Sequence, residues 1–287
     1  MTSSCCIGLC VLNNEKGLPA VLNNITVLRE ANIFKNVQIV AFYDQSKDQS
    51  LQLLKQYQRQ YPSTMIYENP EPLNAPRPER IAYARNGILK MIRENFFYYD
   101  FFAMMDSNDY SCVGRIRPQV LKEMLKRIDE WDSISFDRED GYYDFWALSY
   151  SPFVYSFNHF ENWDDAVKKM RSDFTARLEH HKRETPNQLI RVYSAFNGFS
   201  LYKSSLFLDS RYSSDIHMLA FPQGTVQTHC ETIGQNITGN YKYDCEHRFF
   251  HLDAIRRKDA RICISVLSLF ERVVKNPVFL MPSRRRI

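Results

Sequence analysis

The sequence predicts an α/β fold, a mixed but mainly parallel sheet flanked by helices. Over about the first 110 residues, short apolar segments alternate with segments of helical periodicity, which is the order of a doubly wound sheet. One segment, residues 101–105, is apolar at every position and stops abruptly at acidic residues. Such a run is typical of a strand buried on both faces. We therefore expect helices on both sides of the sheet.

The elements of the first half follow from these patterns. The predicted strands are 6–12, 37–43, 65–67 and 101–105, and the predicted helices are 18–29, 50–61 and 81–95. Crossover connections of this length are right-handed. The loops after Leu12, Tyr43 and Met105 should therefore meet at one edge of the sheet, where open α/β sheets bind their ligands.

The second half is less regular. We expect helices at 118–131 and 162–181, a strand at 133–136 and a pair of strands within 192–207. Residues 262–270 form an apolar strand or helix, and the polar, aromatic stretch 243–251 could turn helical. No internal repeat, low-complexity block or linker interrupts the chain, so we expect a single domain spanning residues 1–287.

Composition excludes several classes of protein. The chain is 44% apolar and 24% charged, as in folded proteins, and its net charge of +4 is too small for a nucleic-acid footprint. The tail Arg284–Arg286 is expected to be a solvated end. No stretch approaches the ~20 apolar residues of a membrane helix. The first residues lack the basic region of a signal peptide.

Cysteine usage points to a reducing setting. The seven cysteines show no zinc-binding spacing, and Cys5, Cys6 and Cys10 are expected to be small buried hydrophobes. We therefore expect a cytosolic protein. The sequons at Asn24 and Asn236 are then chance matches.

The acidic residues after the strand 101–105 are the first candidate site. Asp106, Asn108 and Asp109 offer hard oxygen ligands that suit Mg²⁺ or Mn²⁺ carrying a diphosphate. Asp106 is the expected first ligand, with Asn108 or Asp109 second. Alternatively, Asp109 binds a sugar hydroxyl or caps the following turn, and the whole group forms an ordinary Asx-turn.

Six segments in a fixed order carry a family resemblance. They are YDQSKDQS (43–50), PERIAYARNGIL (78–89), DSND (106–109), YYDFWAL (142–148), SAFNGFSLYK (194–203) and DCEHRFFH (244–251). In this order the chain resembles GT-A glycosyltransferases, in particular viral and bacterial enzymes related to fungal capsule mannosyltransferases. The match extends over residues 5–265. One departure is Asn108, where the family's DxD motif more often has an aspartate.

The resemblance implies a function. It implies a metal-dependent enzyme that transfers a hexose from a UDP- or GDP-sugar to a glycan, a glycoprotein or another polypeptide in the cytoplasm. Residues 1–110 would form the nucleotide-binding half and residues 111–287 the acceptor-binding half. The cofactor would be Mn²⁺ or Mg²⁺, and no nucleic acid would take part.

The resemblance also assigns donor-binding residues. Asp44 and Ser46 match the loop that grips the nucleoside, and a carboxylate at a strand end can accept protons from a base or ribose. Asp44 could instead close an Asx-turn. Arg85 and Asn86 match the segment that faces the nucleotide, and arginine can bind a phosphate in bidentate fashion. The remaining expected donor contacts are Arg80, which lies near Arg77, and Ser107.

The expected catalytic residues lie in the second half. Glu246 is the candidate general base, unless it forms a salt bridge with Arg248 or Arg256. Asp144 is the second candidate, because Asp144 and Trp146 could hold a sugar. The resemblance places a late metal ligand at His247 or His251, although either could be a neutral core histidine. Asn197–Gly198 is expected to form a tight turn near the acceptor.

Two other functions remain open at this stage. A sugar-nucleotidyltransferase also binds a nucleotide and Mg²⁺ on such a sheet, but it carries a glycine-rich basic loop after its first strand. Here that loop, residues 13–17, has one glycine and an acidic residue. A non-catalytic glycan-binding module could also retain the fold, although the acidic residues at 44, 106, 109 and 246 count against it.

Overall fold

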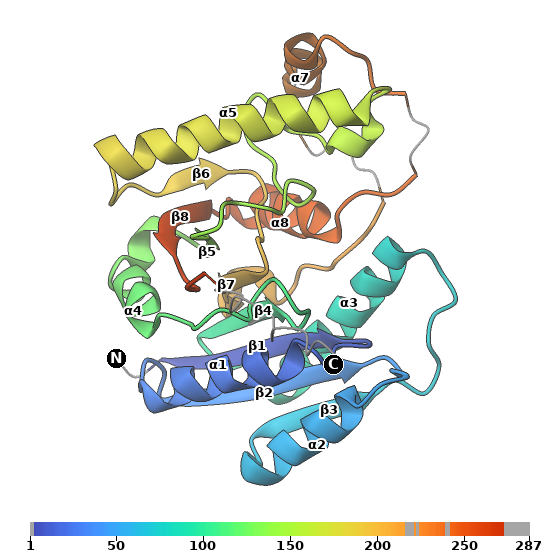
Figure 1. The fold of residues 1–287 in the computed structure, drawn as a ribbon, viewed down its shortest axis with the longest axis vertical. Helices are drawn as coiled ribbons and strands as arrows, with labels where there is room; N and C mark the ends of the chain where they lie inside the picture. The colour runs from blue at the N-terminus through green and yellow to red at the C-terminus, as the bar shows by residue number, and fades with distance from the viewer. Residues whose placement is uncertain (1–2, 216–220, 222–223, 239–241, 273–287) are drawn as a thin grey trace, which may run out of the picture.

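Eight strands form one sheet in the computed structural model, which describes residues 3–215, 221, 224–238 and 242–272 (Figure 1). The strands are β1 (Ser4–Val11), β2 (Asn36–Tyr43), β3 (Thr64–Glu68), β4 (Phe101–Asp106), β5 (Ser133–Asp137), β6 (Ile190–Val192), β7 (Phe199–Lys203) and β8 (Ile262–Ser268). Their order across the sheet is β3-β2-β1-β4-β7-β5-β8-β6. The tail Arg284–Arg286 lies outside the described residues.

In the first half, helices connect the strands as the alternating pattern predicts. The larger ones are α1 (Leu18–Glu30), α2 (Ser50–Gln60), α3 (Arg77–Asn95), α4 (Pro118–Lys126), α5 (Trp163–Glu184), α7 (Thr225–Ile233) and α8 (Glu246–Lys258). A single turn, α6 (Ser204–Phe207), follows β7. Within the described part of the chain, no helix combines the length and apolar character that crossing a membrane requires.

The predicted fold class is confirmed. Strands β3, β2, β1 and β4 pair in parallel, β5 pairs in parallel with β8, and only β6 and β7 run in the opposite direction. Helix α3 covers one face of the sheet with Ile88 and Leu89, while α1 covers the other with Leu18 and Val21. Both faces of β4 are thereby buried, which explains why residues 101–105 are apolar at every position.

The expected strand pair within 192–207 is wrong. Strand β6 pairs with β8, and β7 lies between β4 and β5, so the two are not hydrogen-bonded neighbours. Local apolar periodicity predicts that a strand exists, but its partners depend on the rest of the sheet. Likewise, the predicted helix 118–131 ends early, because α4 stops at Lys126 and the buried Trp131 follows in extended backbone.

The structure also shows which elements the rest of the second half forms. Residues 262–268 form strand β8, and the stretch from Glu246 becomes helical as α8. Asn197 and Gly198 both adopt positive φ angles, 55° and 88°, and so form a tight turn directly before β7. Cys5 and Cys6 are buried as expected, whereas Cys10 lines a cavity.

Candidate active site

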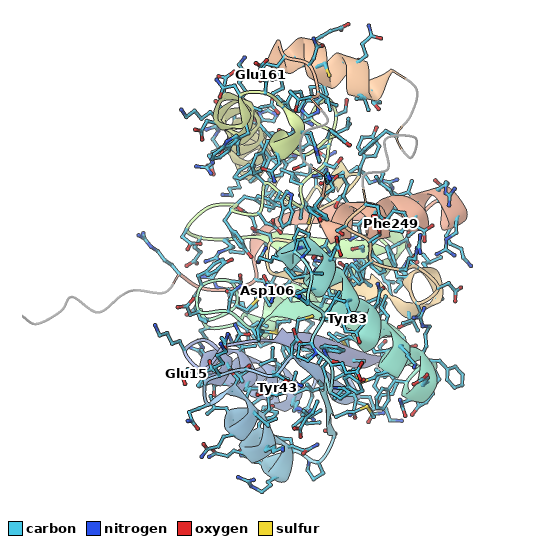
Figure 2. All side chains as sticks on the ribbon, turned by 90° about the vertical axis from the view of Figure 1, so that its right-hand side faces the viewer. Glu15, Tyr43, Tyr83, Asp106, Glu161 and Phe249 are labelled. Atoms are coloured by element: carbon cyan, nitrogen blue, oxygen red, sulfur yellow. The ribbon has the colours of Figure 1, made fainter. Side chains whose placement is uncertain are left out.

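A cavity of about 420 Å³ opens at the carboxyl ends of β1, β2 and β4. Its walls include Leu12, Asp44 and Asp106, which end or follow these three strands. The loops after Leu12, Tyr43 and Met105 thus meet as the crossover rule predicts. In Figure 2, Asp106 lies midway along the molecule, between Tyr43 at the end of β2 and Phe249 on α8. The volume is in the range of small-molecule sites.

Asp106 contacts groups from three parts of the chain. Its Oδ1 lies 3.3 Å from Arg85 Nη2, and its Oδ2 accepts hydrogen bonds from Ser111 Oγ at 3.2 Å and Tyr143 Oη at 3.5 Å. Burial raises the pKa of the Asp106 carboxyl, against the opposing effect of Arg85. The carboxylate therefore depends on cationic partners to stay ionised.

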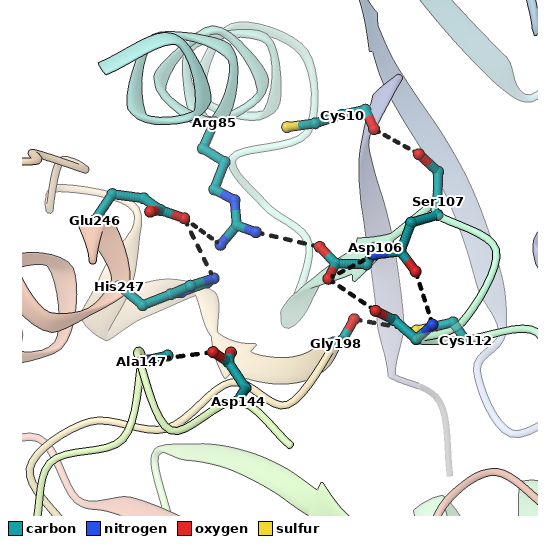
Figure 3. A network of polar contacts seen from close by, with 12 residues as sticks. Cys10, Arg85, Asp106, Ser107, Cys112, Asp144, Ala147, Gly198, Glu246 and His247 are labelled. Carbon is teal, nitrogen blue, oxygen red and sulfur yellow. Dashed lines mark hydrogen bonds and ion pairs between the residues drawn. The ribbon is translucent and has the colours of Figure 1, made fainter. Parts of the chain in front are cut away.

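Arg85 lies between two carboxylates (Figure 3). Its guanidinium reaches Asp106 on one side, and on the other its Nη1 lies 3.1 Å from Glu246 Oε1. The ring of Phe196 packs against the guanidinium, with a distance of 4.5 Å from Cζ to the ring centroid. Arg85 is buried on α3, so its charge needs both acidic partners. Glu246 thus pairs with Arg85, and neither Arg248 nor Arg256 is its partner.

Those two arginines have other acidic partners. Arg248 Nε lies 2.8 Å from Asp244 Oδ2, and Arg256 pairs with Asp253. The buried Arg248 also donates hydrogen bonds to the carbonyls of Trp146, Leu148 and Val154. Arg248 therefore fixes the loop after Asp144 against the beginning of α8.

The two histidines of α8 have different surroundings. His247 lines the cavity, and its ring stacks on Phe196 with centroids 3.9 Å apart. Among the described residues neither of its ring nitrogens has a hydrogen-bond partner, although Nε2 lies 3.9 Å from Glu246 Oε1. Burial and the nearby Arg85 hold the pKa of His247 well below its usual value, so the imidazole is neutral.

His251 lies one helical turn further along α8 and does not line the cavity. Its Nδ1 lies 2.9 Å from Ser194 Oγ, and its Nε2 lies 3.2 Å from Tyr202 Oη. Burial, together with the charges of Arg85 and Arg248, lowers the pKa of His251 to about 3. Because both ring nitrogens have hydroxyl partners, His251 has the contacts of a neutral core histidine.

Asp144 lines the cavity opposite Arg85 and is held by backbone groups (Figure 3). Its Oδ1 accepts a hydrogen bond from the Ala147 amide at 3.2 Å, and its Oδ2 accepts one from the Asn197 amide at 3.3 Å. Burial, with the nearby charge of Asp106, raises the pKa of Asp144 to about 6. Beside it, the buried Trp146 Nε1 has no hydrogen-bond partner among the described residues.

The residues that were expected to bind the donor nucleotide form hydrogen bonds with neighbouring loops. Asp44 Oδ1 accepts a hydrogen bond from Asn69 Nδ2 at 2.8 Å and borders the cavity. Ser46 Oγ accepts one from the Asn13 amide at 2.9 Å but does not line the cavity. Ser107 Oγ donates to the Cys10 carbonyl at 2.6 Å and does line it.

Two arginines of α3 line the cavity without an acidic partner in the described part of the chain. Arg77 and Arg80 both line it, and neither forms an ion pair within the described part of the chain. Arg80 Nε is buried there without a hydrogen-bond partner. By contrast, Asn86 does not line the cavity: its side chain exchanges two hydrogen bonds with the Tyr212 backbone.

The residues after Asp106 form a turn. Asn108 Oδ1 accepts hydrogen bonds from the amides of Tyr110 at 3.1 Å and Ser111 at 2.7 Å, which is the geometry of an Asx-turn. Asn108 borders the cavity, whereas Asp109 is exposed and does not. Asp106 is thus the acidic residue of this group that faces the cavity.

Several residues that contact the expected site residues were not predicted from the sequence. Tyr143, Phe196 and Asn69 contact Asp106, Arg85 and Asp44 respectively, yet aromatic and amide residues give no local signal of such a role. Tyr143 and Phe196 do lie inside two of the motifs that carry the family resemblance. Position within a motif was therefore the one signal that could have identified Tyr143 and Phe196, and Asn69 had no such signal.

The chain is similar to solved structures of known proteins, but its sequence matches no known family. No family model matches the chain, and no curated protein matches its sequence. S. aureus TarS (residues 1–349) is similar with a TM-score of 0.49 and 15% identity, covering 94% of this chain and 60% of that one. The mannosyltransferase PcManGT from Pyrobaculum calidifontis, in complex with GDP-Man and Mn²⁺, has a TM-score of 0.45 and 13% identity, covering 93% and 57%.

A third similar structure is glucosyl-3-phosphoglycerate synthase from Mycobacterium tuberculosis, in complex with Mn²⁺, uridine diphosphate and phosphoglyceric acid. Its TM-score is 0.39 and its identity 11%, covering 71% of this chain and 57% of that one. The chain thus spans about 60% of the length of the TarS fragment and less of the other two proteins.

Proposed function

We propose that the protein is a metal-dependent glycosyltransferase that moves a hexose from a UDP- or GDP-sugar to an acceptor hydroxyl. One observation carries the proposal. A cavity at the carboxyl ends of three parallel strands brings the Asp106 carboxylate together with a second carboxylate, Asp144, and with Arg77 and Arg80. Among the described residues, neither arginine forms an ion pair. A nucleotide sugar has a matching charge pattern, because an anionic diphosphate lies between two neutral, hydroxyl-rich ends.

The diphosphate is assigned to the α3 side of the cavity. Arg77 and Arg80 supply charge-assisted hydrogen bonds to phosphate oxygens. Arg85 also lines the cavity near the diphosphate, but in this structure its guanidinium is paired with Asp106 and Glu246. Asn86 is left out of this assignment because Tyr212 engages its side chain.

The residues present fit a divalent cation that is shared with the donor. Within the described ranges no three His, Cys, Asp or Glu side chains cluster to hold a metal by themselves. Mg²⁺ sites of nucleotide enzymes need only one or two protein ligands, because substrate phosphates and waters complete the shell. Asp106 would be one ligand, and the other would be the neutral His247, whose ring nitrogens have no hydrogen-bond partner among the described residues. A bound Mn²⁺ or Mg²⁺ would stabilise the charge of the leaving diphosphate.

In this proposal the nucleoside and the sugar of the donor occupy opposite ends of the first cavity. Asp44, oriented by Asn69, accepts hydrogen bonds from the ribose or base, while Ser46 shapes the same loop from outside the cavity. At the other end, the Trp146 indole N–H donates to a hydroxyl of the donor sugar. Asp44 and Trp146 both line the cavity.

The acceptor hydroxyl is deprotonated by Asp144 in this proposal. A base works best when its pKa lies near the working pH, and the pKa of Asp144 is raised to about 6. Glu246, the base expected from the sequence, forms a buried ion pair with Arg85 through Oε1. Glu246 is therefore assigned to hold Arg85 in place.

Calorimetric titration tests the proposal and separates its alternatives. UDP- and GDP-hexoses are titrated with and without Mn²⁺ into wild type, Asp106→Asn and the control Asp109→Asn, whose residue is exposed. Binding should strengthen with Mn²⁺ in wild type and control but not in Asp106→Asn. A nucleotidyltransferase would prefer a nucleoside triphosphate, and a glycan-binding module would ignore the metal. Absence of nucleotide-sugar binding to wild type contradicts the proposal.

A further inference from the structure

A second cavity lies next to the first along the same edge of the sheet. Its volume is about 530 Å³, and it lies between the end of β5, at Asp137, and the helix α5, which carries Arg171, Thr175 and Lys182. Figure 1 shows α5 beside the β6 and β8 end of the sheet. None of the functions assigned above uses this cavity, although its size suits a small ligand.

Two aromatic residues join the two cavities. Tyr110 and Tyr143 line both of them, and their rings meet edge to face with centroids 5.5 Å apart. Tyr143 Oη lies 3.5 Å from Asp106 Oδ2, so the shared wall is in contact with the proposed reaction centre. A ligand in the second cavity can therefore extend across these rings into the first.

The charges of the second cavity balance one another. Its three cations are Arg138, Arg171 and Lys182, and its three acidic residues are Asp137, Asp140 and Glu179. Arg138 is paired with Asp140 at 2.8 Å, and Lys182 lies 2.8 Å from both Asp137 Oδ2 and Glu179 Oε1. A phosphate or another polyanion would meet as many acidic as basic groups. The cavity therefore favours a neutral, polar ligand.

One buried carboxylate in this cavity can accept a further hydrogen bond. Asp137 is only 1% exposed, Lys182 lies 2.8 Å from its Oδ2, and within the described residues no side chain donates to its Oδ1. Leaving a buried carboxylate oxygen unpaired costs free energy, which a hydroxyl group of a ligand would recover. A pyranose has such hydroxyls around its rim and an apolar C–H face that packs on aromatic rings such as Tyr110.

We propose that the second cavity binds a sugar unit of the acceptor, so that the acceptor is a glycan. This assignment rests on the proposed glycosyltransferase function. The sugar hydroxyls bond to Asp137 and to Arg171, which packs on the ring of Phe145 and forms no ion pair within the described residues. The chain of the glycan crosses Tyr110 and Tyr143 toward Asp144. A polypeptide acceptor without sugar would not use these contacts.

The experiment blocks the second cavity with a large side chain introduced at an exposed position of α5. Thr175 lines the cavity on the exposed side of α5, so Thr175→Trp should block it without disturbing the core. Ala176→Trp is the matched control, because Ala176 is also exposed but does not line the cavity. Saturation-transfer NMR is recorded with methyl α-mannoside, methyl α-glucoside, methyl β-galactoside and N-acetylglucosamine, each with saturating UDP or GDP and Mg²⁺.

At least one of these sugars should bind wild type and Ala176→Trp, and its signal should be lost in Thr175→Trp. No sugar signal from wild type, or an undiminished signal in Thr175→Trp, overturns the assignment. Calorimetric titration of UDP and GDP into the same variants reports on the first cavity alone. Retained nucleotide binding without sugar binding would therefore refute this inference only, whereas sugar binding without nucleotide binding would refute the proposed function.

Discussion

Arg85 and Glu246 form a buried ion pair, with Nη1 3.1 Å from Oε1 and side chains that are 8% and 4% exposed. The same guanidinium also reaches Asp106, so one cation neutralises two carboxylates from distant parts of the chain. The pair joins α3 to the first residue of α8. It therefore couples the stability of the fold to the geometry of the proposed donor site.

Removing this cation should destabilise the protein strongly. Arg85→Leu leaves the buried Glu246 and the partly buried Asp106 without a cationic partner. Breaking a buried pair in this way typically costs about 3–5 kcal/mol of unfolding free energy. Urea denaturation at neutral pH measures the loss. Lys90→Ala, at a 72% exposed position of the same helix, should change the free energy by less than about 0.5 kcal/mol. Equal stability of the two variants would show that the ion pair contributes nothing.

Activity should depend on the ionisation of Asp144. Because burial and Asp106 raise its pKa to about 6, kcat/KM should increase with pH and level off above that value. Asp144→Asn should remove this acidic limb and lower kcat by about 10²–10⁴. Glu246→Gln should keep the limb. If Glu246→Gln abolished it instead, Glu246 would be the base, as the sequence suggests.

The same raised pKa affects stability, with the opposite sign. The folded state binds the Asp144 proton more tightly than the unfolded state, whose carboxyl has a pKa of about 3.9. The contribution is therefore fully present below that value and is lost as the pH rises through about 6. Asp144→Asn should flatten this part of the curve of unfolding free energy against pH. An unchanged curve would mean that Asp144 titrates at its ordinary value.

Asp44→Ala should mainly weaken donor binding. Contacts to a nucleoside are alike in the ground state and the transition state, so the donor KM should rise with little change in kcat. Steady-state kinetics with varied nucleotide sugar measure both constants. Asn69→Ala should act in the same direction and less strongly, since Asn69 orients Asp44 through one hydrogen bond. A collapse of kcat alone would place Asp44 in the chemical step.

Asp132 should govern stability in acid. This buried carboxylate lies 2.9 Å from Arg261 Nε and 2.8 Å from Lys203 Nζ. Burial alone would raise its pKa, but these hydrogen bonds hold the pKa far below the usual range. Its stabilisation is present above about pH 3.9 and is lost as the pH falls below that value. Asp132→Asn should thus reduce the acid sensitivity of unfolding, whereas Asp209→Asn, 66% exposed, should not.

Much of the first half could be predicted from the sequence. Apolar periodicity identified β1, β2, β3 and β4 and the helices between them, because buried faces repeat at the period of the element itself. The right-handed crossover then placed the loops after Leu12, Tyr43 and Met105 together. The position of Asp106 at the cavity follows from local sequence and one topological rule.

Only the tertiary structure decided which groups meet within the site. Glu246 could have paired with an arginine of its own helix, but Arg85 is its partner, and Asn108 is turned toward backbone amides. The two histidines of α8 have the same spacing signal, yet His247 faces the cavity and His251 faces Ser194 and Tyr202. The physical reason is that periodicity depends on neighbours along the chain, whereas ion pairing and burial depend on neighbours in space.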